Sequence, residues 1–395
     1  MHFVVTVGPG TRPGRREVAF KRRPLCAIAT AMQRRLTQFF QSRVGRALST
    51  FFTPGPRMID ELECVASVAL AILLAHTIGA KSVAWAAFTG FVLMRGHVAQ
   101  TLLRGLLRIV GTAVGAGAAL LIVPYAVRSL PMASLAAAVM GAIGLYGMLT
   151  AKRAYAWLLL GLTFELILLD TLEHPALDTL AFAQTRLLEV LAGTAACVAV
   201  SLISTLTVRR RWPAPPAVPA QRIGWHRDAA RHAAQAGVTL ALLPPLHALF
   251  GIPQLAQASV TVMTVMIVPV ARLGRSGLAP VSKRLWHRAL GCIGGGALAA
   301  AVLVVAHGSA PVLIAGTCLG VAIGRHIENA GGRVPYLGLQ FTLAILVTLV
   351  PDSYADVAIR PALERLTSIF IGMALIEPVL LVWHFASRRM PAAAS

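Results

Sequence analysis

The sequence predicts an all-α integral membrane protein of about twelve transmembrane helices, arranged as two parallel six-helix repeats with both termini cytoplasmic. The first observation is composition. Hydrophobic residues make up 57% of the 395 residues, charged residues make up 13%, and the mean hydropathy is +0.72, which excludes a water-soluble globular chain. The second is that apolar segments of about 20 residues, long enough to cross a bilayer as helices, alternate with short charged or Pro- and Gly-containing breaks.

The third observation is an internal repeat. An arginine pair, two glycines and a later tyrosine recur in the same order about 180 positions further on. Arg104, Arg108, Gly111, Gly115 and Tyr155 recur as Arg284, Arg288, Gly291, Gly295 and Tyr336. Gene duplication followed by fusion explains this order, and two similar halves are typical of secondary transporters.

The apolar segments and the charged or Pro- and Gly-containing breaks between them predict where the helices lie. In the first repeat we expect them at about residues 61–80, 82–94, 106–127, 131–150, 154–171 and 185–207. In the second repeat we expect them at about residues 232–250, 255–271, 287–306, 310–324, 335–350 and 362–386. Most Lys and Arg side chains then fall in loops on one side of the membrane, and the positive-inside rule makes that side cytoplasmic. Because each repeat crosses an even number of times, the two repeats share one orientation.

The segments outside the repeats are basic. Residues 1–57 are expected to form a cytoplasmic tail, partly disordered and partly an amphipathic helix on the membrane surface. The first repeat spans 58–208, a basic Pro-rich cytoplasmic linker spans 209–231, the second repeat spans 232–387, and a short cytoplasmic tail spans 388–395. Because the net charge of +21 gathers in these segments and in the loops of one side, it indicates anionic lipids as partners rather than nucleic acid.

The sequence indicates neither an enzyme nor a cofactor. Five cysteines are scattered without pair spacing, so no disulfide framework or metal site is expected. No Ser/His/Asp or Cys/His constellation stands out. The glycines after the arginine pairs are predicted to pack helices closely, since no Gly-Lys-Ser or Gly-Lys-Thr ending marks a phosphate-binding loop.

Four motifs carry a family resemblance. They are a Trp-Ala pair entering the second helix, Arg before Gly-Thr-x-x-Gly in the third, Tyr opening the fifth, and Arg-x-x-Glu-x-x-x-Gly in the sixth. Here they read Trp85 and Ala86, Arg108 with Gly111 to Gly115, Tyr155, and Arg186 with Glu189 and Gly193. From about residue 60 to 385 the chain resembles the fusaric acid resistance protein family of the bacterial inner membrane. A departure is that the sizeable cytoplasmic domain of many members is replaced by a short connector.

The resemblance implies a transporter that exports aromatic or other organic acids with the proton-motive force, sometimes together with a periplasmic adaptor protein. An organic acid is therefore the expected substrate, while an adaptor and a homo-oligomer stay open as partners. Two alternatives remain. A passive organic-anion channel would also use arginine-lined mouths, and a non-transporting membrane scaffold would act through its basic tail.

Ionisable side chains within the predicted helices are candidates for proton coupling, because a carboxyl group in hydrocarbon is costly unless it is paired or neutral. Glu165 is the first candidate, since its apolar helix has no basic residue within four positions. Glu189 follows Arg186 at i+3 spacing, which also suits a structural ion pair. Glu377 precedes a proline, and His76 lies near a helix end. For these two, a simple helix bend and an interfacial histidine are the structural alternatives.

Arginine and aromatic side chains are the candidates for substrate binding. A planar guanidinium group suits a carboxylate, and an aromatic wall suits a ring. The candidates are Arg186, Arg104, Arg108, Arg284, Arg288, Trp85, Tyr155 and Tyr336. Each arginine pair has i, i+4 spacing at the cytoplasmic mouth of a helix, where arginine also fixes topology and binds lipid phosphate.

Overall fold

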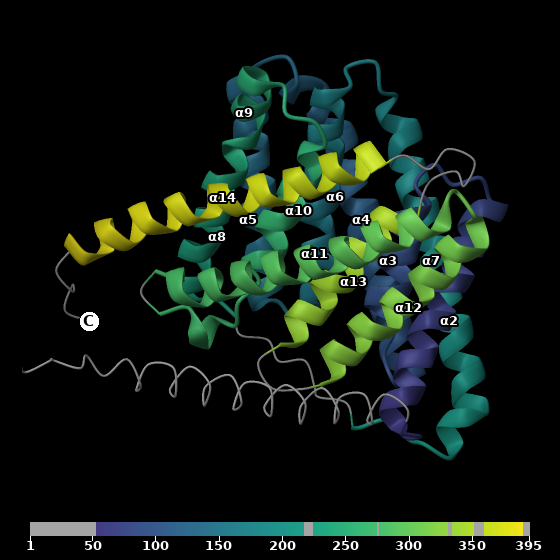
Figure 1. Cartoon of the computed structure of the whole chain (residues 1–395). Coiled ribbons are helices and arrows are strands. Elements are labelled where there is room, and N and C mark those ends of the chain that lie inside the picture. Colours follow the sequence, from purple (N-terminus) through teal and green to yellow (C-terminus); the bar gives the residue numbers. More distant parts are fainter. Residues whose placement is uncertain (1–52, 217–223, 275, 331–333, 351–358, 390–395) are drawn as a thin grey trace, which may run out of the picture. The chain divides into compact units, whose positions relative to one another are not determined.

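The computed structural model describes residues 53–216, 224–274, 276–330, 334–350 and 359–389, and no strand occurs among them (Figure 1). The helices of the first half are α2 (Pro56–Thr77), α3 (Val83–Leu93), α4 (Val98–Ala126), α5 (Leu130–Thr150), α6 (Ala154–Glu173) and α7 (Thr179–Leu206). Those of the second half are α8 (Arg227–Ala241), α9 (Leu243–Phe250), α10 (Leu255–Val265), α11 (Leu278–Ala306), α12 (Ala310–Asn329), α13 (Pro335–Leu349) and α14 (Ile359–Arg389). Two short 3-10 turns are η1 (Val208–Arg210) and η2 (Val270–Arg272).

A helix occupies each range that the sequence predicts, with one range divided into α8 and α9 near two consecutive prolines. The second half begins earlier than expected, because α8 starts at Arg227 rather than near residue 232. Most of the predicted basic tail, residues 217–223 of the linker and the last six residues lie outside the described part.

By length and composition, eight helices in the described part can cross a membrane. They are α4, α5, α6, α7, α8 continued by α9, α11, α12 and α14. Helix α2 is not among them, because Asp60, Glu61 and Glu63 lie near its start. Helices α3, α10 and α13 are apolar but shorter. The twelve crossings therefore stay a prediction.

The short helices α3 and α10 occupy corresponding places in the two halves. Each has 11 residues. At about 1.5 Å per residue, such a helix covers only about half of a hydrocarbon core roughly 30 Å thick. Short or interrupted helices at corresponding positions of two repeats are typical of the binding region of a transporter.

Helices with glycine faces pack closely in both halves. Helix α4 packs on α6, and α11 packs on α13. A Cβ atom added at Gly115 would meet the backbone oxygen of Leu160, and one added at Gly295 would meet that of Phe341. These contacts leave no room for a side chain, which agrees with the packing role predicted for these glycines.

The two halves pack on each other at several places, including α6 on α10, and two of these seams differ in chemistry. Helix α5 packs on α8, where a Cβ atom on Gly237 would meet the backbone oxygen of Ala138 at 2.6 Å. Helix α2 packs on α12, as Figure 1 shows, and this seam is ionic. Arg325 of α12 donates to both carboxylate oxygens of Asp60 on α2, at 2.7 and 3.0 Å. The α5–α8 seam is thus held by close contact between the two helix backbones, and the α2–α12 seam is held by ion pairs.

Candidate functional site

A central cavity of about 210 Å³ is lined by helices of both halves. Helices α3, α4, α6 and α7 contribute from the first half, and α10, α11, α13 and α14 from the second. Most of the predicted substrate-binding residues line it, namely Trp85, Arg108, Tyr155, Arg186, Arg284, Arg288 and Tyr336. The remaining one, Arg104, lies just behind the wall, with its guanidinium carbon 5.8 Å from the centre of the Tyr155 ring. Residues far apart in the chain therefore meet around one cavity.

Neutral side chains hold the two arginines that are most deeply placed in this wall. Arg108 is 7% exposed and donates to the Tyr155 hydroxyl at 2.7 Å. Arg288 is 2% exposed and donates to Thr261 Oγ1 at 2.9 Å, and it also donates to the side-chain oxygen of Gln340. Because these acceptors carry no charge, they orient the guanidinium groups without neutralising them.

Several donors around the cavity have no acceptor within the described part of the chain. They are the Nε atoms of Arg108, Arg186, Arg284 and Arg288, together with the Tyr336 hydroxyl. A buried donor without an acceptor costs about 1–3 kcal/mol, and the cost is larger for a charged group. Such a cost is typical of a site that is completed by a ligand or by water.

The charges of the lining residues do not balance. Four arginines line the central cavity, and Glu189 is the only carboxylate among its lining residues. Glu189 pairs with Arg186 at 3.1 Å. The guanidinium groups of Arg108, Arg284 and Arg288 therefore line the cavity without a carboxylate partner among the described residues. This arrangement attracts an anion, and the low dielectric of a membrane interior strengthens the attraction.

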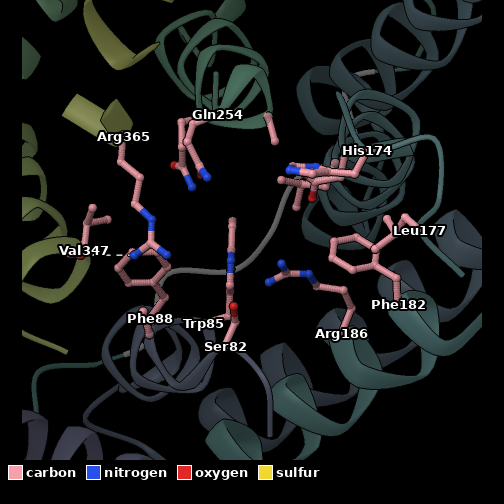
Figure 2. A pocket seen from close by; sticks show the side chains of 15 residues that line it. Ser82, Trp85, Phe88, His174, Leu177, Phe182, Arg186, Gln254, Val347 and Arg365 are labelled. Carbon is pink, nitrogen blue, oxygen red and sulfur yellow. Dashed lines mark hydrogen bonds between the residues drawn. The ribbon is translucent and has the colours of Figure 1, made fainter. Parts of the chain in front are cut away.

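An outer chamber of about 270 Å³ adjoins the central cavity on the side away from the basic loops. Figure 2 shows the side chains that line this chamber. Both are lined by Trp85, Phe88 and Arg186, so the two spaces share a wall. The Arg186 guanidinium carbon lies 5.0 Å from the Trp85 ring centre and 4.6 Å from that of Phe182. Figure 2 shows Arg186 between these two rings, which keep it extended at the boundary of the chambers.

The outer chamber also contains ionisable residues that the sequence did not single out. Asp170 and His174 of α6 lie on it, and Arg365 of α14 lies opposite and donates to the backbone oxygen of Val347 at 3.2 Å. The sequence pointed to them only through their places near helix ends. A sequence feature that indicates the site better is the shortness of the apolar segments that form α3 and α10, since both helices line the central cavity.

The proton-coupling candidates are not gathered at one place. Glu189 lines the central cavity. Glu165 is fully buried but lines neither this cavity nor the outer chamber, and neither of its carboxylate oxygens has a partner among the described residues. Glu377 accepts a hydrogen bond from Ser282 at 2.7 Å in a separate groove. His76 is exposed in the last turn of α2. Only Glu189 therefore touches the candidate site directly.

Comparison with known proteins confirms, over the first part of the chain, the resemblance that the motifs indicate from about residue 60 to 385. Residues 62–239 match the fusaric acid resistance protein family. The matched segment contains Trp85, Arg108, Tyr155, Arg186 and Glu189 of the cavity wall. No curated protein and no solved structure matches the chain.

Proposed function

Since residues 62–239 match the fusaric acid resistance protein family, we propose that this membrane protein is an inner-membrane exporter of aromatic or other organic acids. The proposed substrate binds in the central cavity, with its carboxylate toward the arginines and its ring toward the apolar wall. The coarser conclusion, a multi-pass membrane protein with a role related to transport, rests on the family match and on the apolar helices.

The observation that carries this proposal is the set of unmatched guanidinium groups between the two halves. Arg108 comes from the first half, and Arg284 and Arg288 come from the second. An anion that binds among them contacts both halves at once. A site at the interface of two repeats, at the level of short helices, is the arrangement that alternating access requires.

Aromatic rings beside the arginines favour an aromatic acid. The Arg284 guanidinium carbon lies 3.9 Å from the centre of the Tyr336 ring, and Trp85 contacts Phe88 edge to face with ring centres 5.3 Å apart. Leucine and valine side chains form much of the remaining wall. A cavity that is mostly apolar, with a few convergent polar groups, selects a ligand with one charged end and one apolar end.

The difference between the two seams supports alternating access. Close backbone approach keeps α5 and α8 together, so we propose that this seam acts as the pivot. The α2–α12 seam rests on Asp60 with Arg325 and on Glu61 with His326, where the carboxylate oxygen and the imidazole nitrogen are 2.8 Å apart. Exchange of such charged partners opens a seam without exposing apolar surface.

Proton coupling is proposed to use Glu165. Its two oxygens have no partner among the described residues, so the carboxyl group is best accommodated in the neutral form. An added Cβ atom at Gly141 of α5 would lie 3.4 Å from Glu165 Oε1. Because α5 belongs to the proposed pivot, protonation of this carboxyl group can affect the packing of the two halves.

Efflux of radiolabelled benzoate from cells tests this function. We expect the wild-type protein to accelerate efflux, a protonophore to abolish the acceleration, and Arg288→Gln to reduce it strongly because the variant removes a cavity charge. Arg128→Gln is the matched control, since Arg128 is exposed at a loop and stacks on Tyr125 rather than facing the cavity. Equal efflux with and without the protein, across a panel of aromatic acids, would contradict the proposal.

The same assay separates an exporter from a passive channel. An exporter accumulates a gradient of benzoate at the expense of the proton gradient, and Glu165→Gln removes this dependence. A channel carries benzoate down its own gradient regardless of the protonophore and of Glu165. A scaffold shows no transport with any variant.

A further inference from the structure

An inner chamber of about 570 Å³ lies at the end of the bundle that carries the basic loops. It is bounded by the start of α2, the loop between α3 and α4, the turn η1 with the residues after it, and the end of α12. Its charged lining residues are Arg57, Asp60, Arg95, Arg209 and Arg325, with His97 beside them. The chamber therefore contains an excess of positive charge on the side opposite the outer chamber.

Three of these arginines are matched by carboxylates. Arg57 donates to Glu61 at 3.2 Å, Arg209 donates to Glu63 at 2.6 and 2.8 Å, and Arg325 donates to Asp60. Arg209 also lies 3.9 Å from Asp60. His97 contacts the backbone oxygen of Pro215 at 2.7 Å. These groups already have partners and form the ionic seam between α2 and its neighbours.

Arg95 differs from them. Its backbone bonds to Thr101, but its guanidinium group makes no hydrogen bond or ion pair within the described part of the chain. Burial, together with the nearby Arg104 and Arg325 guanidinium groups, lowers the pKa of Arg95 to about 10. Glu328 acts in the opposite direction but forms its ion pair with Arg325. Arg95 is thus a poorly hydrated cation among cations, a situation that a bound anion relieves.

We propose that Arg95 forms a second anion-binding site, at which an organic carboxylate is held in the inner chamber before it reaches the central cavity. This inference rests on the proposed transport function. The ligand contacts the Arg95 guanidinium group, while Asp60 keeps Arg209 and Arg325 engaged and so prevents them from competing for the carboxylate.

Further arginines lie between the inner chamber and the central cavity. Arg95 is within electrostatic range of Arg104 and Tyr155. Arg104 stacks on the Tyr155 ring, and the hydroxyl of the same tyrosine accepts a hydrogen bond from Arg108 in the central cavity. Arg95, Arg104 and Arg108 therefore form a series of cations between the inner chamber and the central cavity, along which we expect a carboxylate to move.

Equilibrium binding of radiolabelled benzoate to the purified full-length protein in phosphatidylcholine nanodiscs tests this site. We expect the wild-type protein to bind one benzoate ion in each of the two sites. Arg95→Gln should lose the inner one and keep the central one, Arg288→Gln should show the opposite loss, and Arg95→Lys should retain part of the inner binding because the charge remains. Unchanged binding stoichiometry in Arg95→Gln would overturn the inference.

A transport measurement gives a second readout that a purely structural role would not change. In proteoliposomes, Arg95→Gln should raise the apparent KM about tenfold for benzoate offered on the side of the basic loops, with kcat nearly unchanged. An equal loss of kcat from both sides would contradict a binding role. Benzoate binding that depends on Arg95 but not on Arg288 would keep the inner site and refute the central one, so the two proposals fail separately.

The phosphate of a lipid headgroup offers the same anionic chemistry as a carboxylate. The binding experiment is therefore repeated with phosphatidylglycerol in place of phosphatidylcholine. Persistence of the Arg95-dependent benzoate binding supports the carboxylate, because a free organic acid then competes successfully with the lipid. Its disappearance in phosphatidylglycerol would assign the site to a lipid headgroup and overturn the inference.

Discussion

Replacement of Arg288 by methionine separates a ligand-binding arginine from a structural one. The guanidinium group is buried and is held by Thr261, Thr264 and Gln340, while its Nε atom has no acceptor within the described residues. A charge-assisted hydrogen bond to a ligand carboxylate is worth about 1.5–3 kcal/mol, which corresponds to about 10- to 150-fold in affinity. We therefore expect Arg288→Met to weaken benzoate binding by about 100-fold.

This loss is measurable as ligand-dependent stability. Benzoate at 100 times the wild-type Kd should stabilise the wild-type protein by about 2.7 kcal/mol, and at the same concentration it should stabilise a variant with a 100-fold larger Kd by only about 0.4 kcal/mol. Without benzoate, the desolvation cost of the buried cation and its bonds to neutral acceptors oppose each other. We therefore expect the free energy of unfolding to change by about 1 kcal/mol or less.

Arg325→Met is the matched control. Arg325 is similarly buried, but it is paired with Asp60 and Glu328. Its removal leaves two partly buried carboxylates without their main partner and should lower the free energy of unfolding by about 3 kcal/mol, while benzoate still stabilises the variant. Thermal unfolding of the purified proteins with and without benzoate gives both quantities. A loss of about 3 kcal/mol in ligand-free Arg288→Met would refute the reasoning, because it would show that Arg288 is structural.

Three further predictions concern single positions. Glu165→Met should raise the free energy of unfolding by about 1 kcal/mol, because a buried carboxyl group without a partner is replaced by apolar atoms, and thermal unfolding that shows a loss would point to an essential partner. Gly115→Ala should cost about 1–3 kcal/mol through its clash with the Leu160 backbone oxygen, whereas Gly117→Ala on the same helix, where a Cβ atom meets nothing within 4 Å, should not destabilise the protein. Burial alone would raise the pKa of Asp60, but hydrogen bonds from Arg325 and Asn329 hold this pKa below 3.8. The ionised Asp60 therefore contributes its full stabilisation at neutral pH, and this stabilisation is lost as pH falls from about 4 through the lower folded-state pKa. A comparison of wild-type and Asp60→Asn stability between pH 7 and pH 3 checks this sign, since the variant should lack that part of the decline.

The asymmetry between the two seams was not predictable from the repeat. Matching landmarks such as Arg108 and Arg288 suggest equivalent halves, yet α2 carries acidic residues that meet Arg325 and His326 of α12. Nothing in the local sequence around Asp60 or Arg325 specifies this partner, because the two residues are far apart in the chain. The charge pattern indicated cytoplasmic loops for Arg209 and Arg325, and the structure shows that both are buried in ion pairs.

The sequence alone determined where the helices lie, because the length of an apolar segment and its charged or Pro- and Gly-containing boundaries act locally. It also determined which residue types can bind an anion, since an arginine side chain within a membrane-spanning segment has a high free-energy cost and usually has a function. The tertiary structure decided how these residues are grouped. It placed Arg108 and Arg288 around one cavity, kept Glu165 out of the lining of that cavity, and placed Arg95 in a separate chamber with three paired arginines. The periodicity of a helix relates side chains within one element, whereas the rotation and partner of each helix depend on close packing across the whole bundle.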